Sequence, residues 1–90
     1  MYQIILTDEY QKIEKKFFKK HPELKERYKK ILKILKVDPF YPSLRLHKLQ
    51  GSDLYSISLN MQYRLLLDFV IKENEIILVN IGGHEIYSNI

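Results

Sequence analysis

A chain of 90 residues has the length of one small domain, and its content of 46% hydrophobic and 29% charged residues excludes an intrinsically disordered protein. The absence of cysteine excludes disulfides and cysteine-based zinc sites, and it fits a reducing compartment. No apolar run reaches the roughly 18 residues that a membrane-spanning helix needs, and residues 2–6 are too short and lack the basic flank of a secretory signal. We therefore expect a single domain over residues 1–90, located in the cytoplasm, with no membrane partner.

The first part of the chain predicts a short strand and a helix. Residues 2–6 are apolar enough for a strand. Thr7 and Asp8 then offer a helix N-cap, with Gln11 as the partner of a capping box. Apolar residues follow with helical spacing up to about residue 20, at Tyr10, Ile13 and Phe17.

A second helix is predicted to begin at His21 and Pro22, because proline is well tolerated in the first turn of a helix. We expect it to end at Val37 and Asp38, since Pro39 disfavours helix in the residue before it. His21 is then simply a residue at the start of this helix. The apolar stripe of the helix has the spacing of an amphipathic helix and comprises Leu24, Tyr28, Ile31, Leu32 and Leu35.

The net charge of +4 is concentrated in these two helices. Residues 12–36 contain ten lysines and one arginine against three glutamates, a net charge of +8, whereas the rest of the chain has four positive and eight negative residues, a net charge of −4. A surface of this sign attracts polyanions. A solvated lysine face is the alternative. The residues that we expect to bind a polyanion are Lys12, Lys15, Lys16, Lys19 and Lys20, together with Lys48 further along the chain.

After the loop at residues 38–43 the apolar period changes from 3.6 to 2, which predicts strands. Alternation over residues 55–59 and 63–71 indicates strands with one buried face, and the aliphatic run at residues 75–81 is typical of a central strand. The order β-α-α-β-β-β predicts an α+β fold, with a helical hairpin packed on one face of a small antiparallel sheet.

Alternation also predicts where Arg64 lies. If Tyr63 and Leu65 face the helices, Arg64 points to the opposite face of the sheet, which no helix covers. A guanidinium there can bind a phosphate through two parallel hydrogen bonds. The alternative is an ordinary surface arginine paired with Asp68.

Two histidines lie where they could converge on Arg64. His47 is in the segment that enters the sheet, and Gly82 and Gly83 break the last strand so that His84 turns away from its axis. Imidazole gives or takes a proton near neutral pH. Together with Arg64 they indicate phosphodiester cleavage without a metal or another cofactor. The alternatives are structural or solvated histidines, or a metal site with Glu85 as third ligand.

Four pieces of the second half, in this order, carry a family resemblance: LHKLQG at residues 46–51, LYSISL at 54–59, YRLL at 63–66, and IGGH at 81–84 followed by Tyr87. With the lysine-rich helical hairpin before them, they make the chain similar over nearly its whole length to the RelE/ParE superfamily of type II toxin–antitoxin toxins. The resemblance is closest to the YafQ-like branch. The sequence departs from RelE-type members, which have lysines where Ser56 and Ser58 stand here. YafQ-type members also have a further histidine and an aspartate, near the positions of Leu59 and Tyr63.

The resemblance implies a ribosome-dependent mRNA endoribonuclease, with a cognate antitoxin protein, the ribosome and mRNA as partners. It implies that His47 and His84 perform acid–base work, that Arg64 stabilises the phosphate, and that Tyr87 contacts the mRNA base. The implied reaction is attack of a ribose 2′-OH on the adjacent phosphate. Two other functions remain open: a ParE-like protein that poisons DNA gyrase without catalysis, and an inactive member that only binds its antitoxin.

Overall fold

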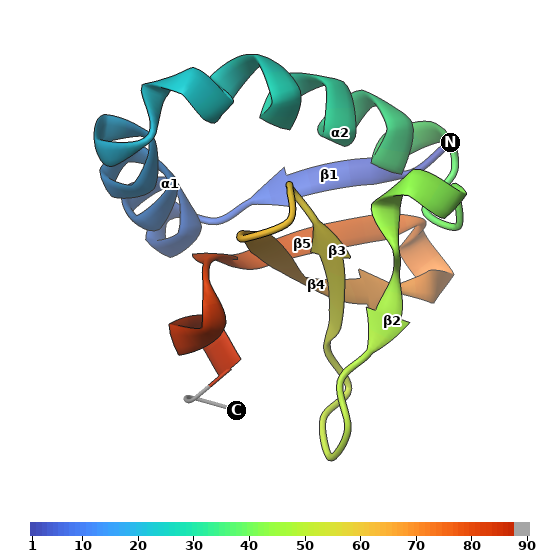
Figure 1. The fold of residues 1–90 in the computed structure, drawn as a ribbon. Coiled ribbons are helices and arrows are strands. Elements are labelled where there is room, and N and C mark those ends of the chain that lie inside the picture. Colours follow the sequence, from blue (N-terminus) through green and yellow to red (C-terminus); the bar gives the residue numbers. More distant parts are fainter. Residues whose placement is uncertain (88–90) are drawn as a thin grey trace.

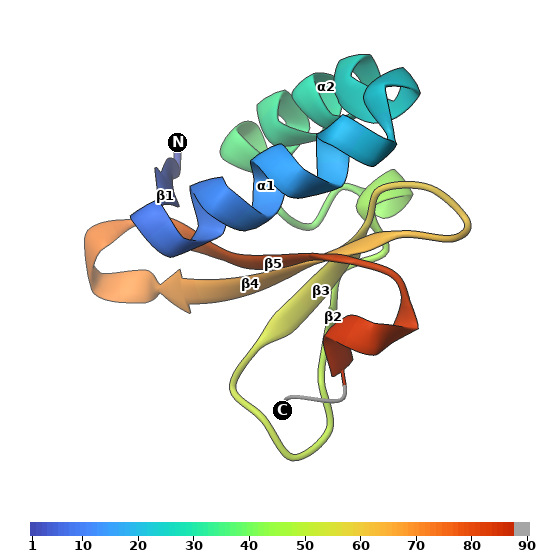
Figure 2. The same cartoon turned by 90° about the vertical axis from the view of Figure 1, so that its left-hand side faces the viewer.

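The computed structural model describes residues 1–87. It consists of a five-stranded sheet with both helices on one face (Figures 1 and 2). The final three residues of the predicted 1–90 domain lie outside the described part. The sheet order is β1-β5-β4-β3-β2. Its strands are β1 (Gln3–Leu6), β2 (His47–Lys48), β3 (Tyr55–Ser58), β4 (Arg64–Val70) and β5 (Glu75–Gly82).

The two predicted helices are present, with differences at their starts. Helix α1 (Asp8–Lys20) is capped by Thr7, whose side chain accepts the Tyr10 N–H. The predicted capping box at Asp8 is therefore wrong by one residue, and the Gln11 amide instead donates to the Leu6 carbonyl. Helix α2 (Lys25–Val37) follows a short 3-10 turn, η1 (Pro22–Leu24), so Pro22 begins this turn and not the helix itself.

The α+β class is confirmed, but the sheet is mixed, so the prediction of an antiparallel sheet was wrong in one pairing. Strand β1 pairs in parallel with β5, and all other neighbours are antiparallel. After the helices the chain enters the sheet as β2, at the edge opposite β1. It then reverses direction before each of β3, β4 and β5, so that β5 lies beside β1 and runs in the same direction. The fifth strand, β2, is a two-residue addition that pairs with β3.

The core lies between the helices and one face of the sheet, where Leu65 and Leu67 of β4 are completely buried, as the alternation predicted. A register shift at Leu66/Leu67 lets β5 contribute Leu78 and then Ile81 to this same core. This bulge adds one unpaired residue to β5, so the residues of β5 that face the core are three positions apart there instead of two.

The opposite sheet face was predicted to be open, and this is only partly correct. Ser56 is 0% exposed and Leu66 is 2% exposed, although both belong to this face. The β2–β3 turn and the C-terminal 3-10 turn η4 (His84–Tyr87) both project from the sheet on the side away from the helices (Figures 1 and 2). The face is therefore flanked by two projecting segments.

The helical hairpin is fixed internally by a buried polar contact. The Tyr10 and Tyr28 hydroxyls lie 2.8 Å apart, and the Tyr28 hydroxyl donates to the Glu14 carboxylate. Burial raises the pKa of both tyrosines, so both remain protonated donors. Within residues 1–87, no helix has the length and apolar character needed to cross a bilayer.

Candidate active site

Arg64 begins β4 and is held by contacts on the sheet face away from the helices. Its Nε donates to the Ser56 hydroxyl at 2.9 Å, and its Nη2 donates to the Arg45 carbonyl at 3.0 Å. Ser58 lies directly opposite Arg64 in the ladder, so Ser56 is the diagonal neighbour, within reach of a long side chain. Nη1 has no hydrogen-bond partner among residues 1–87, which leaves its two N–H groups available to an anion.

His47 stands beside this guanidinium. Its Nδ1 lies 3.3 Å from Arg64 Nη2, and its Nε2 lies 3.4 Å from the Ser56 hydroxyl. A guanidinium only donates, so the contact with Arg64 is a hydrogen bond only when Nδ1 has no proton. In the other tautomer, Nδ1 donates to the Arg45 carbonyl at 3.4 Å, and Nε2 can accept from the Ser56 hydroxyl.

Arg45 supplies the carbonyl that orients both groups, and its backbone is unusual. It has a left-handed conformation, with φ of 51°, at the end of the turn η2 (Pro42–Leu44). This conformation costs a non-glycine residue about 1–2 kcal/mol. Such costs are concentrated at functional sites, where the surrounding structure enforces them. At Arg45 this backbone conformation turns the carbonyl group toward Arg64 and His47.

The turn η4 packs against the backbone of Gly82, which is the β5 partner of Arg64. A Cβ atom on Gly82 would lie 2.6 Å from Glu85 Oε1 and 2.7 Å from Ile86 Cγ2. Glycine is therefore required for this close approach. Glu85 Oε1 accepts the Gly83 N–H at 3.0 Å, and hydrogen bonds from the backbone N–H groups of Glu85 and Gly83 lower the pKa of the carboxyl.

The four expected catalytic residues therefore form two groups. His47 and Arg64 are in contact, whereas His84 is exposed on η4 with its ring 6.2 Å from that of Tyr87. Among residues 1–87, neither a hydrogen bond nor a ring contact joins His84 to His47 or Arg64. The alternative pairing of Arg64 with Asp68 is not formed within this part of the chain, where Arg64 contacts Ser56, Arg45 and His47 instead.

The expected RNA-binding lysines are exposed. Five of them lie on α1, and Lys48 lies in β2, 4.0 Å from the Asp53 carboxylate. As for the metal alternative, no group of three or more histidine, aspartate or glutamate side chains in the described part of the chain is arranged to hold an ion.

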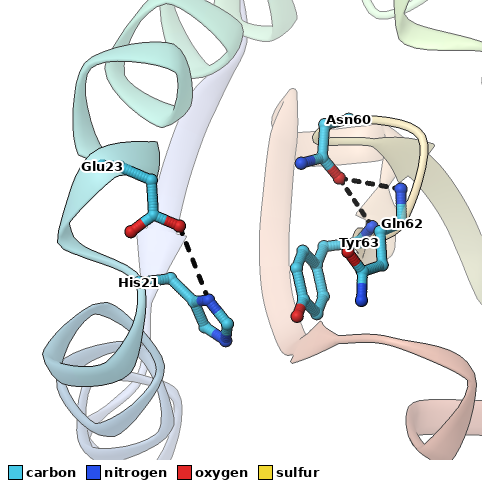
Figure 3. A network of polar contacts seen from close by, with 5 residues as sticks. All are labelled: His21, Glu23, Asn60, Gln62 and Tyr63. Carbon is cyan, nitrogen blue, oxygen red and sulfur yellow. Dashed lines mark hydrogen bonds and ion pairs between the residues drawn. The ribbon is translucent and has the colours of Figure 1, made fainter.

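Sequence reasoning missed His21, which belongs to a second group of aromatic residues. Its ring centroid lies 4.7 Å from those of Phe17 and Tyr63, and its Nδ1 lies 3.7 Å from the Glu23 carboxylate. Figure 3 shows the His21 ring reaching from the end of α1 toward Tyr63 on the β3–β4 turn. The alternation correctly turned Tyr63 toward the helices, but it contained no signal for the contact with His21.

No protein-family model and no curated protein matches this sequence. Solved structures do match. A metal-bound toxin from Helicobacter pylori is 26% identical, with a TM-score of 0.78 over 94% of this chain and 97% of that one. YafQ from E. coli strain BL21(DE3) is 14% identical, with a TM-score of 0.75 over 97% and 98%. The YoeB–YefM complex from Staphylococcus aureus is 17% identical, with a TM-score of 0.69 over 93% and 98%.

The last two similarities lie below 25% identity and concern the fold alone. All three matches are with structures of toxins, and two of these are of the YafQ and YoeB types. The RelE/ParE-like fold that the resemblance implied is thereby confirmed, with YafQ among the structural neighbours.

Proposed function

We propose that this protein is the toxin of a type II toxin–antitoxin system and that it cleaves mRNA on the ribosome as a metal-independent endoribonuclease. The observation that carries the proposal is the contact of 3.3 Å between Arg64 Nη2 and His47 Nδ1 on the sheet face away from the helices. A fixed guanidinium with a free Nη1, next to an imidazole, suits a reaction that builds negative charge on a phosphate while a proton is removed.

In the proposed reaction His47 is the base and acts through Nε2, while Nδ1 donates to the Arg45 carbonyl. It takes the proton of a ribose 2′-OH as the 2′-oxygen bonds to the adjacent phosphorus. Arg64 meets the charge on the pentacoordinate phosphorane through Nη1. The bond from phosphorus to the 5′-oxygen then breaks, and His84 protonates that oxygen. The products are a 2′,3′-cyclic phosphate and a 5′-hydroxyl end. Tyr87, next to His84 on η4, contacts the base of the substrate.

The proposed partners are a cognate antitoxin, the ribosome and mRNA. The S. aureus neighbour was solved as a complex of YoeB with YefM, which supports an antitoxin here as well. The exposed lysines of α1 support a polyanionic partner, because a row of like charges on one helix attracts phosphate backbones. Lys12, Lys15 and Lys19 also line a groove between the two helices, so this groove is the expected contact with ribosomal RNA.

Expression in a bacterial host, followed by mapping of mRNA 5′ ends, tests this function. We expect new 5′ ends within translated codons, and none when Arg64→Ala is expressed at the same level. Asp68→Asn is the matched control, since Asp68 lies on the same strand without contacting Arg64. A DNA-damage response with intact mRNA would instead indicate gyrase poisoning, and an absence of any growth defect would indicate an inactive, antitoxin-binding protein.

A further inference from the structure

A cleft of about 520 Å3 lies between the end of α1 and the ends of β4 and β5. It combines two cations, two imidazoles, a phenol and an amide, from Lys16, Lys20, His21, Gln62, Tyr63 and His84. Of these, only Lys16, Lys20 and His84 were expected to have a function, and nothing in the sequence placed them together. The volume lies within the range of small-ligand pockets and accommodates a nucleotide.

The aromatic wall of the cleft is rigid. The rings of Phe17, His21 and Tyr63 all touch one another, with centroids 4.7–5.2 Å apart. Asn60 Oδ1 accepts the backbone N–H groups of Gln62 and Tyr63 at 2.9 and 2.8 Å, which fixes the β3–β4 turn (Figure 3). His21 remains 27% exposed, so part of its ring can still be reached from the cleft.

The charge of the cleft favours an anion. Lys16 and Lys20 are exposed, and neither takes part in any ion pair among residues 1–87. One carboxylate, Glu85, also lines the cleft, and it accepts the Gly83 N–H. A basic groove with aromatic rings is the arrangement on which single-stranded nucleic acid binds, with bases stacked and phosphates on the lysines.

Residues of the cleft and of the candidate active site are neighbours along the same strands. Tyr63 faces the cleft, and the next residue, Arg64, faces the opposite side of the sheet. In the same way, Gly82 pairs with Arg64, and His84, two residues further on, lines the cleft. A polynucleotide whose phosphate lies on Arg64 can therefore pass around this end of β4 and β5 into the cleft.

We propose that this cleft binds a nucleotide of the single-stranded RNA substrate next to the cleaved position, with its base against His21 and Tyr63 and its phosphate on Lys16 and Lys20. This assignment rests on the proposed function, since it makes the cleft a second substrate contact of the same enzyme. In this arrangement His84 lies between the nucleotide in the cleft and the phosphate on Arg64.

The test uses the full chain and a non-cleavable probe, a 2′-O-methylated RNA trinucleotide, with binding followed by NMR and calorimetry. We expect the His21 and Tyr63 ring signals to shift, and His21→Ala to weaken binding roughly tenfold, the typical effect of losing one stacked base. His21→Phe keeps a ring in the cluster, so it should retain more of the affinity than His21→Ala does, and thermal melts check that both variants fold.

A second pair of variants does not depend on the aromatic cluster. Replacing Lys16 and Lys20 together with glutamine should lower the slope of log K against log salt by about 0.7, because the two lysines contact one phosphate and each phosphate contact on a single strand contributes about 0.7. Replacing Lys30 and Lys33 of α2 with glutamine removes the same charge away from the cleft and should leave the slope unchanged. Equal effects of the two double variants would overturn the proposal, as would tighter binding of an acidic peptide than of the trinucleotide at the same rings.

The two proposals fail in different ways. If the trinucleotide shifts only signals of His47 and Arg64, the cleft assignment is wrong while the endoribonuclease stands. If the cleft rings shift but no mRNA is cut in cells, the cleft binds RNA and the proposed enzyme activity is wrong.

Discussion

Truncation of Arg64 to alanine separates a catalytic role from a structural one. The variant loses the hydrogen bonds to Ser56 and to the Arg45 carbonyl. Hydrogen bonds of charged groups contribute about 1.5–3 kcal/mol each. Because Arg64 is half-exposed, we expect a total loss of about 2 kcal/mol. For a domain of this size that corresponds to a fall in Tm of roughly 10 °C.

A loss of that size does not unfold the protein at 25 °C. Domains of about 90 residues have free energies of unfolding of roughly 5–13 kcal/mol, so more than nine-tenths of the variant chains remain folded. Unfolding therefore explains less than a twofold loss of cleavage. Removal of one charge-stabilising donor typically lowers the rate by about 10²–10³. The two explanations differ by at least an order of magnitude, which an assay can resolve.

The assay is cleavage of mRNA in a translating extract at 25 °C, with the folded fraction measured in parallel by circular dichroism. Arg64→Ala should cleave about 10²–10³ times more slowly, and Arg64→Lys should have an intermediate rate, because lysine retains the charge without the forked geometry. Asp68→Asn should cleave as wild type does. If Arg64→Ala retains a rate within a few-fold of wild type, the reasoning about this site is refuted.

Three further predictions concern the segments around Arg64. Gly82→Ala should displace η4 and lower cleavage at least tenfold, whereas Gly83→Ala, with an added Cβ 3.0 Å from Glu85 Oε2, should have a smaller effect in the same assay. Cleavage should follow a bell-shaped pH profile, from which His47→Ala removes the acid limb and His84→Ala the alkaline limb; folded variants with an unchanged profile would remove both histidines from the mechanism. Because backbone hydrogen bonds lower the pKa of Glu85, its stabilisation of η4 should be complete at neutral pH and be lost as the pH falls through that lowered value. The Gly83 amide signal in NMR reports this titration, and a midpoint at the ordinary glutamate pKa would contradict it.

The two helices could be predicted from the sequence because their signals are local. Apolar spacing along each helix identified the buried side, and Pro39 indicated the end of α2 at Val37. The cap was assigned within one residue, since Thr7 and Asp8 are both good capping residues and only the backbone decides which of them is used.

Strand direction and the covering of the second sheet face could not be predicted in this way. Alternation identifies the face of each residue but carries no information on whether a neighbour runs parallel. Ser56 appeared to be a surface residue, and it is completely buried because Arg64 and His47 pack near it. Whether a small polar residue is buried depends on which side chains from other segments cover it, and this is a property of the assembled fold.

The sequence alone determined which residue types were available for chemistry and which sheet face would present Arg64. Tertiary structure decided which of them meet, because contacts between distant segments depend on ladder register and turn geometry. It brought His47 to Arg64 through the pairing of β2 with β3, and it turned the Arg45 carbonyl toward both. It also placed His84 beside a cleft whose wall includes His21, a residue that the local pattern had assigned only to the start of a helix.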